Sequence, residues 1–345
     1  MALRAETTSF VLDDSAAGTT TTKGGTSTTL VGRSRAGDAT AFAIPELKWL
    51  FDCGAVLEKQ GWKPRIIFLT HTHADHVHFL FRFGDKERPP TVYLPEAGAP
   101  FVEACLKAYD EMTECRATTA TTRTEDQDHS EDDNDTTGGT EKKAGHVVLR
   151  GAKSDEDIFV SHGGNKFRVR TLNMIHRIPC LGYSIFRLRN TLKEEYRGLP
   201  GKEIGQLKKK GVEVTTVEEQ PYLCFMGDTT PGVFEENPEI LKQHSRVVVE
   251  CTFIDVESRQ RAETTKHTHW DDLQPHIASN PGTMFILIHF SLKYSALSLR
   301  RFFRDHQVLY DNIHPMLVER EVEEQWRKTG EEGDPPRCNC RTCRG

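Results

Sequence analysis

The sequence lacks the long apolar runs of a membrane protein. No apolar stretch approaches the roughly 18 to 20 residues that a bilayer-spanning helix needs, and no basic and then apolar signal opens the chain. The opening MALRAETTSFVLDD contains an arginine but soon becomes acidic, which argues against a transit peptide. We therefore expect an intracellular protein without membrane contact, in the cytoplasm or nucleus, with an organelle as the alternative.

The nine cysteines lack the spacing of a disulfide framework. Six are scattered, several within apolar runs, as expected of buried thiols in a reducing compartment. The other three, Cys338, Cys340 and Cys343, lie together in the C-terminal CNCRTCRG. Three thiolates at this spacing suit zinc, but no fourth ligand is evident locally. A reactive or partner-dependent cysteine tail fits the spacing equally well.

An excess of positive charge is also absent, since the formal net charge is −6. One stretch, TEDQDHSEDDND at residues 124–135, holds seven acidic residues and no basic one. Subtracting its −7 from −6 leaves about +1 for the rest of the chain. The net charge therefore does not exclude a nucleic-acid partner, and local patches must decide.

Two segments lack the apolar surface that a folded core requires. Residues 1–27 predict a flexible tail, and residues 116–145 predict a disordered acidic insertion. Elsewhere, ten short apolar runs mixed with helical patterns predict an α/β domain over residues 28–310. Residues 311–345 predict an exposed helix followed by the Cys-rich tail.

Imidazoles and carboxylates gather where the apolar runs end. The stretch IIFLTHTHADHVHFL places His-x-His-x-Asp-His directly after a strand-like run, and four later runs end close to a His, Asp or Glu. The spacing does not fit one face of a helix, because residues i and i+2 diverge there, but a tight loop could bring it to two adjacent metals. The residues are His71, His73, Asp75, His76, His176, Asp228, Glu250 and His289.

Taken alone, each of the four residues after the later apolar runs would more often be an ordinary polar residue at the end of a strand. The dense first cluster makes them completing ligands instead. Other zinc patterns do not compete, because the chain has no His-Glu-x-x-His and no deaminase-type His-x-Glu with a paired Cys-x-x-Cys.

The motif HTHADH resembles the signature of the metallo-β-lactamase superfamily, which implies an αββα four-layer sandwich. The segments IHRIPCLGYSIF, FMGDTTP, VVVECTF, KHTHWDDL and LIHFSLKYS resemble, in order, motifs of tRNase Z (ribonuclease Z), and EEYRGLPGKEIGQLKKKGVEV is similar to the short-form enzymes. The resemblance covers about residues 28–300. It implies a zinc-dependent endoribonuclease that removes 3′ trailers from precursor tRNA, by metal-hydroxide attack on a phosphodiester, and that forms a homodimer.

The resemblance also implies a role for each residue of the site. It implies two Zn²⁺ per chain, with Mn²⁺ as an alternative: one held by His71, His73 and His176, the other by Asp75, His76 and His289, with Asp228 bridging. Asp75 would also orient or deprotonate the attacking hydroxide. His267 corresponds to the proton donor for the departing 3′ oxygen, with Glu250 fixing its ring. His269 is the rival for that role.

A basic segment predicts the RNA contact. Residues 187–210 carry eight basic and three acidic side chains, a local charge of +5, within the predicted tRNA-binding arm at residues 187–215. Its natural phosphate contacts are Lys202, Lys208, Lys209 and Lys210. The alternative is a solvated turn between strands.

Two other functions remain open. The first is a small-molecule metallo-hydrolase of the same fold, acting on thioesters or phosphodiesters, and the basic arm argues against it. The second is a non-catalytic metal-binding subunit, and the full set of seven ligands argues against that.

Overall fold

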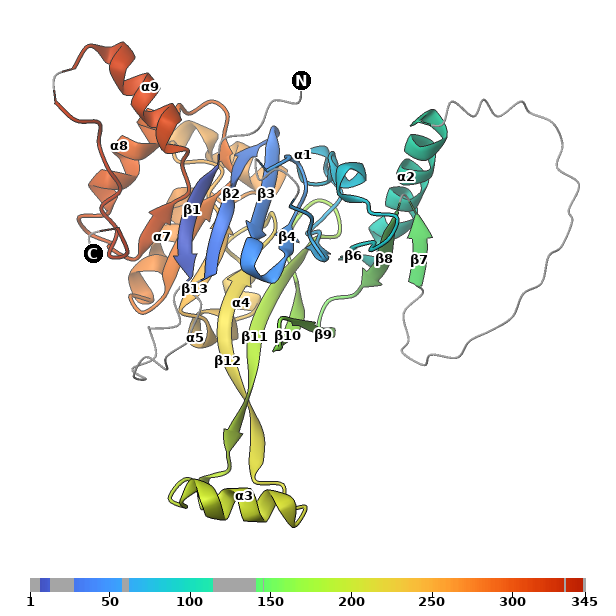
Figure 1. Ribbon diagram of the computed structural model, residues 1–345. Helices are drawn as coiled ribbons and strands as arrows, with labels where there is room; N and C mark the ends of the chain where they lie inside the picture. The colour runs from blue at the N-terminus through green and yellow to red at the C-terminus, as the bar shows by residue number, and fades with distance from the viewer. Residues whose placement is uncertain are drawn as a thin grey trace, which may run out of the picture.

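Two β-sheets pack face to face and carry helices on their outer faces (Figure 1). The computed structural model describes residues 7–12, 28–57, 62–113, 141–144, 146–331 and 333–343. Within these residues the predicted αββα sandwich is confirmed. All ten apolar runs that predicted strands contain strands.

The first sheet comes mainly from the N-terminal half of the chain. Its order is β1 (Thr8–Leu12), β2 (Thr28–Ala36), β3 (Ala39–Ile44), β4 (Trp49–Phe51), β5 (Ile66–Phe68), β6 (Thr91–Pro95), β8 (Val147–Ala152) and β7 (Glu141–Ala144), while β15 (Phe290–Ser291) pairs with β2. Strands β3, β4 and β5 are buried at every residue, because one face meets the second sheet and the other meets helices.

The second sheet comes from the C-terminal half. Its order is β16 (Ile313–Pro315), β14 (Met284–Ile288), β13 (Arg246–Glu250), β12 (Thr215–Phe225), β11 (Leu181–Leu192), β10 (Asn165–Asn173) and β9 (Asp157–His162). Strands β12, β13, β14 and β16 are parallel neighbours, and β10 runs in the same direction because β11 is antiparallel to both β10 and β12. The C-terminal ends of these strands therefore meet at one edge of the sheet.

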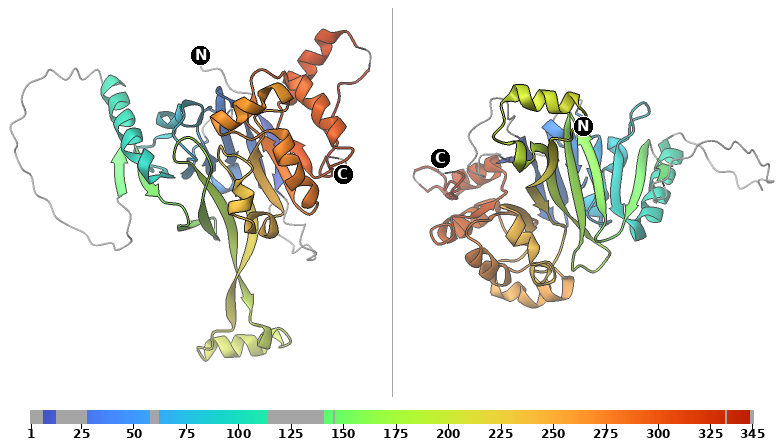
Figure 2. Two further views of the ribbon diagram at one scale, coloured as in Figure 1. Left: turned by 180° about the vertical axis from the view of Figure 1, so that it is seen from behind. Right: turned by 90° about the horizontal axis from the view of Figure 1, so that it is seen from below.

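Three apolar clusters hold the layers together. Aromatic rings fill the space between the sheets, where Phe51 stacks on both Phe68 and Phe225. A second cluster lies under α4 (Val233–Glu236), α5 (Glu239–Gln243), α7 (Trp270–Ser279), α8 (Ala296–His306) and α9 (Glu319–Thr329). A third lies under α1 (Ala74–Val77) and α2 (Ala99–Thr113). Seen from below, the orange and red helices and the teal helix α2 lie on opposite sides of the strands (Figure 2).

Strands β11 and β12 extend beyond the body as a two-stranded arm (Figures 1 and 2). The residues of β12 are exposed near the tip and buried only from Tyr222 onward. Helix α3 (Gly201–Lys209) lies across the tip, so the segment is a helix-capped hairpin rather than a simple turn. The short helix α6 (Arg259–Thr265) precedes α7.

The predicted domain boundaries need two corrections. Thr8–Leu12 form strand β1, within the segment predicted as a flexible tail, because Phe10 and Leu12 alternate into the core between the sheets. Ile313–Pro315 pair with β14, so the folded domain continues past residue 310. Most of the predicted acidic insertion, residues 114–140, lies outside the described residues. In the part of the chain that is described, every helix is too short or too polar to cross a membrane.

A buried histidine gives the fold a pH dependence. His244 is 2% exposed at the end of α5, and its Nε2 lies 2.7 Å from Ser184 Oγ of β11. Burial, together with the positive charge of Arg168, lowers the pKa of His244 to about 4. The unfolded histidine takes up its proton near its ordinary pKa of 6.5, so this stabilising contribution is present above that pH and is lost as the pH falls from about 6.5 to 4.

We expect His244→Gln to flatten this dependence. Glutamine can keep a polar contact with Ser184 but does not titrate. Between pH 7 and pH 4, the free energy of unfolding should fall by roughly 2 to 3 kcal/mol less in the variant than in the wild type. The measurement is urea unfolding of both metal-free proteins across this range, with pH 8 as the baseline. Parallel curves for the two proteins would contradict the assignment.

Candidate metal centre

The loop after β5 brings four of the predicted residues to one edge. After Phe68 the chain continues through Leu69 and Thr70 into the His71–His76 loop, whose last three residues begin helix α1. Gly54 makes the close packing of this loop possible, because a Cβ there would lie 1.7 Å from the carbonyl oxygen of Asp75. The amide of Cys53 also donates to the carbonyl oxygen of His76, at 2.7 Å.

The second sheet supplies the remaining residues from its strand ends. His176 follows β10, Asp228 follows β12 and His289 follows β14. His289 has a left-handed backbone with φ of 62°, which costs about 1 kcal/mol for a residue other than glycine. Such strain, held at the junction of β14 and β15, is typical of functional positions.

In three histidines, the ring nitrogen that points away from the cluster is hydrogen-bonded to a protein group. His76 Nδ1 lies 2.8 Å from an oxygen of Asp52, and His176 Nδ1 lies 3.1 Å from the carbonyl oxygen of Lys266. The Lys266 carbonyl can only accept a hydrogen bond, and the same is true of Asp52 when it is ionised. Each Nδ1 therefore carries the ring proton. A neutral ring then has an unprotonated Nε2 pointing away from its partner.

His289 is fixed in the same way through Thr252. Its Nδ1 lies 3.0 Å from Thr252 Oγ1, whose own proton goes to the Glu250 carboxylate or to the carbonyl oxygen of His289. The hydroxyl therefore accepts from Nδ1, and Nε2 of the neutral ring is a lone pair. Sequence reasoning missed both Asp52 and Thr252. The only available signal was that Asp52 also directly follows an apolar run.

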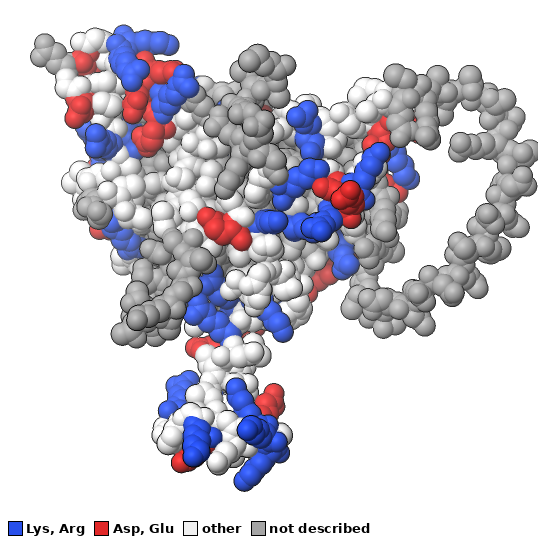
Figure 3. Space-filling view, in the orientation of Figure 1, with Lys and Arg blue, Asp and Glu red and all other residues white. Residues whose placement is uncertain are grey.

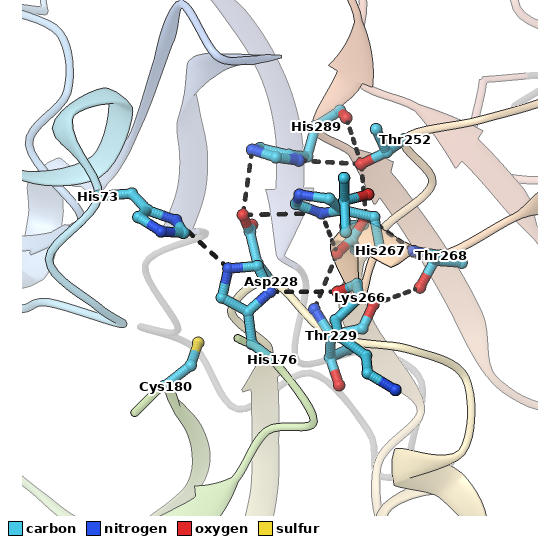
Figure 4. A network of polar contacts seen from close by, with 12 residues as sticks. His73, His176, Cys180, Asp228, Thr229, Thr252, Lys266, His267, Thr268 and His289 are labelled. Carbon is cyan, nitrogen blue, oxygen red and sulfur yellow. Dashed lines mark hydrogen bonds and ion pairs between the residues drawn. The ribbon is translucent and has the colours of Figure 1, made fainter. Parts of the chain in front are cut away.

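The ring nitrogens that point into the cluster face one another at short range, as Figure 4 shows for His73 and His176. His73 Nδ1 lies 3.0 Å from His71 Nε2 and 3.3 Å from His176 Nε2, and His76 Nε2 lies 3.3 Å from His289 Nε2. Burial lowers the pKa of His71, His73 and His176, which favours their neutral, lone-pair form. Two nitrogen ligands of a tetrahedral Zn²⁺ lie about 3.3 Å apart. The arrangement fits divalent cations.

Asp228 lies between the two groups of histidines. Its carboxylate oxygens are 3.6 Å from His71 Nε2, 3.5 Å from His76 Nε2 and 3.4 Å from His289 Nε2. Burial would raise its pKa, but the surrounding histidines hold the pKa of this carboxyl well below its usual range. Two adjacent sets of donor atoms result: His71, His73, His176 and Asp228, and Asp75, His76 and His289.

Glu250 organises the neighbouring part of the site. It is 1% exposed, and one oxygen accepts from the Thr229 amide at 2.8 Å and from His267 Nδ1 at 2.9 Å. The other oxygen accepts from the Thr268 amide at 3.1 Å and from the Thr252 hydroxyl. Burial alone would lower the pKa of His267, but the Glu250 carboxylate raises it to about 9.

The structure separates His267 from its rival His269. The His267 ring stacks on His289 with centroids 5.3 Å apart. His269 is fully buried, and its Nε2 lies 2.8 Å from the carbonyl oxygen of Asp255. Its Nδ1 accepts from the Asp271 amide, so His269 caps the start of helix α7.

A cleft of about 330 Å³ opens over these residues. Asp75, Asp228, His267 and His289 line it, and His269 is not among its lining residues. Arg177 and Arg261 also reach the cleft, and sequence reasoning assigned them no role. Because Arg177 directly follows His176, its position in the sequence could have predicted that it lies near the site. The lysines predicted to bind RNA lie elsewhere, on α3 and its C-terminal cap.

Sequence comparison supports the same chemistry. The family described as the metallo-β-lactamase superfamily matches residues 36–148. Over this segment the chain resembles that superfamily, as the HTHADH motif predicted. It is 28% identical over 272 residues to Arabidopsis thaliana tRNase Z TRZ1, covering 76% of this chain and 85% of that protein. It is 26% identical over 276 residues to chloroplastic tRNase Z TRZ2 of the same plant, covering 78% and 69%.

Among solved structures, the short form of human tRNase Z aligns with a TM-score of 0.43 and 16% identity, covering 76% of this chain and 92% of that one. The resemblance to tRNase Z inferred from the motifs is confirmed by the named relatives. With this family match and these relatives, the chain is a metal-dependent hydrolase.

We expect Asp52→Asn to weaken metal binding. If the new amide oxygen keeps the Thr70 contact, its NH₂ group faces His76 Nδ1. The amide NH₂ and the Nδ1–H group are both hydrogen-bond donors and cannot pair. The ring therefore shifts its proton to Nε2, the atom that faces His289. Affinity for a divalent metal should fall roughly 10- to 100-fold, as measured by competition with a chromophoric chelator.

The matched control is Asp305→Asn, the same change on a side chain that is 77% exposed on α8. It should bind metal like the wild type. Equal affinity in Asp52→Asn and in the wild type, with both proteins folded by circular dichroism, would contradict the orienting role.

Proposed function

We propose that the protein is an endoribonuclease that removes the 3′ trailer from precursor tRNA with the help of two zinc ions. The observation that carries the proposal is the presence, in one chain, of two adjoining sets of metal-ligand atoms and a separate cationic arm. The relatives named tRNase Z support the same reaction.

In this proposal one ion is held by His71, His73 and His176, the other by Asp75, His76 and His289, and Asp228 contacts both. The carboxylate of Asp228 supports this bridging role because it lies within 3.6 Å of histidines from both sets. Two divalent ions held here would supply a water of lowered pKa and positive charge for the scissile phosphate.

The chain's own residues would position the substrate and the protons. Arg177 and Arg261 line the cleft and would bind phosphate oxygens beside the scissile bond. Asp75 also lines the cleft, held by the Gly37 amide at 2.8 Å, and would orient the attacking water or take its proton.

His267 would donate the proton to the departing 3′ oxygen when the phosphorus–oxygen bond breaks. Glu250 binds Nδ1, which fixes the ring and leaves Nε2 as the donor. Glu250 is thus a positioning residue. His269 is a poor candidate for the donor, because both of its ring nitrogens already contact backbone groups.

The arm would bind the substrate away from the cleft. Lys208, Lys209 and Lys210 are consecutive and exposed at the C-terminal end of α3, where the helix dipole favours positive charge. Lys202 is exposed at the start of the same helix. Figure 3 shows basic side chains grouped over this tip. RNA recognition through backbone and shape needs such a surface rather than base-specific pockets.

Dimerisation and compartment remain predictions. One relative is named chloroplastic, which keeps the organelle among the alternatives.

The first test is cleavage of a precursor tRNA that carries a 3′ trailer, with mapping of the cut ends. We expect one cut at the trailer junction in the metal-loaded protein. Asp228→Ala should lower the rate by about 10³-fold or more, because it removes the contact to both metals. Asp305→Ala is the matched control and should cut normally.

Each other outcome has its own meaning. Metal binding without RNA cleavage, together with turnover of small thioesters or phosphodiesters, would favour a small-molecule hydrolase. Absence of both cleavage and metal would favour a non-catalytic subunit.

The second test concerns the arm. Replacing Lys208, Lys209 and Lys210 together by Gln should raise KM for precursor tRNA roughly tenfold and leave turnover of a small phosphodiester unchanged, because the cleft is intact. The slope of log affinity against log salt should shrink by roughly two to three for the same reason. Both quantities come from salt titrations of binding and cleavage.

The matched control replaces Lys107, Lys153 and Lys328, three exposed lysines outside the arm, by Gln. It removes the same charge. An equal rise in KM in both triple variants would mean that total charge, and not the arm, attracts the RNA.

A further inference from the structure

A second cluster of metal-ligand atoms lies outside the cleft, at the C-terminal tail. His314, Cys338, Cys340 and Cys343 each direct one donor atom to a common point, and these atoms all lie within 4.8 Å of one another. Three of the four are the tail cysteines. The fourth is a histidine of strand β16, 24 residues before Cys338, which the local sequence of the tail could not reveal.

The distances match a tetrahedral zinc site. His314 Nδ1 lies 3.3 Å from the sulfur of Cys340 and 3.6 Å from the sulfurs of Cys338 and Cys343. With zinc–sulfur bonds of about 2.3 Å and a zinc–nitrogen bond of about 2.0 Å, tetrahedral geometry separates nitrogen from sulfur by about 3.5 Å. All three measured separations lie close to that value.

The surroundings are built to hold these side chains in place. Gln307 is 1% exposed, and its amide nitrogen donates to Cys338 Sγ at 3.1 Å and to the carbonyl oxygen of Ile313 at 3.0 Å. Its carbonyl oxygen accepts from the Asn339 amide at 2.7 Å. An amide aimed at sulfur stabilises a thiolate, the form that binds metal.

The tail and its histidine are also positioned by backbone contacts. The Cys343 amide donates to the carbonyl oxygen of Cys340 at 3.0 Å, which closes a tight turn between the two sulfurs. The Arg341 amide donates to the carbonyl oxygen of Asp311 at 2.8 Å. The His314 ring packs on Phe10 of β1, with ring centroids 4.9 Å apart.

We infer that His314, Cys338, Cys340 and Cys343 bind a structural Zn²⁺ that is separate from the metal centre of the cleft. Four protein ligands complete a tetrahedral shell and leave no position for substrate, which is the pattern of structural zinc. Softer thiolate ligands also set this site apart from the histidine and carboxylate donors of the cleft.

The position of the site indicates what the zinc stabilises. It joins the tail to β16, the edge strand of the second sheet, next to the N-terminal strand β1. Strand β16 pairs with β14, and His289 directly follows β14. The zinc therefore stabilises the edge of the sheet that leads into one side of the cleft. It does not contact the groups that are proposed to react there.

The first experiment measures zinc per chain by mass spectrometry after dialysis under reducing conditions. Cys343→Ser and Cys340→Ser should each lose about one zinc relative to the wild type, because a four-ligand site needs every ligand. Cys343 is exposed, so its variant should fold even where the buried Cys340 variant does not. Cys105→Ser, an exposed cysteine on α2, is the matched control and should keep all of its zinc.

A pair of variants at His314 tests the fourth ligand. His314→Ala should lose the same zinc, while His314→Cys should keep it, because a thiolate can take the histidine's place. Thermal stability should follow zinc content in this pair. Cleavage of precursor tRNA, measured where each variant is folded, should remain in all of them, which separates failure of this proposal from failure of the proposed activity.

Cobalt provides a spectroscopic readout. In cobalt-loaded Asp228→Ala protein, thiolate-to-cobalt charge-transfer absorption should be present, since no ligand proposed for the cleft is a cysteine. Cys343→Ser should weaken this absorption. Unchanged zinc content and spectrum in the cysteine variants would overturn the inference. So would a disulfide between tail cysteines that survives with full stability in the presence of a chelator.

Discussion

The structure of the cleft depends on one electrostatic constraint: imidazole nitrogens of several histidines face one another at about 3 Å. Asp52, Thr252 and the Lys266 carbonyl bind the Nδ1 atoms of His76, His289 and His176, so in the neutral rings each Nε2 is a lone pair, and such lone pairs repel one another unless a cation lies between them. A divalent cation removes that repulsion and balances the buried carboxylates at the same time. The hydrogen bonds around the histidines are therefore as much a part of the centre as the ligands themselves.

Strand direction is what brings these groups together. The parallel strands β12, β13 and β14 end at one edge of their sheet, where the chain leaves Asp228, Glu250 and His289. The other sheet meets that edge through the loop after β5. Glu250 then links the parts, because its two oxygens contact Thr229, Thr252, Thr268 and His267. A rigid pair of packed sheets can hold such an arrangement in register, whereas a single loop could not.

For the proposed function, the division of charge explains how an acidic protein could bind RNA. Basic residues are in excess in the segment that forms the arm, and two arginines line the cleft, while the net charge of −6 arises largely from residues 124–135. The arm is thin and exposed, so its lysines are available to phosphates at little cost in desolvation. The proposed function thus places RNA binding and the chemistry in different parts of the same two-sheet domain.

By itself the sequence determined the strand-forming runs, the ligand types at their ends and the basic arm, because hydrophobic period and motif spacing are local properties. It could not locate β1, whose five residues precede a polar, Thr-rich stretch and become a strand only through Phe10 and Leu12 in the core. Nor could it pair Asp52 with His76, or distinguish His267 from His269, two residues apart. The clearest example is the fourth ligand proposed beside the three tail cysteines. His314 meets them only because β16 lies at the sheet edge and the tail folds back onto it, and contacts between distant residues are decided by tertiary packing.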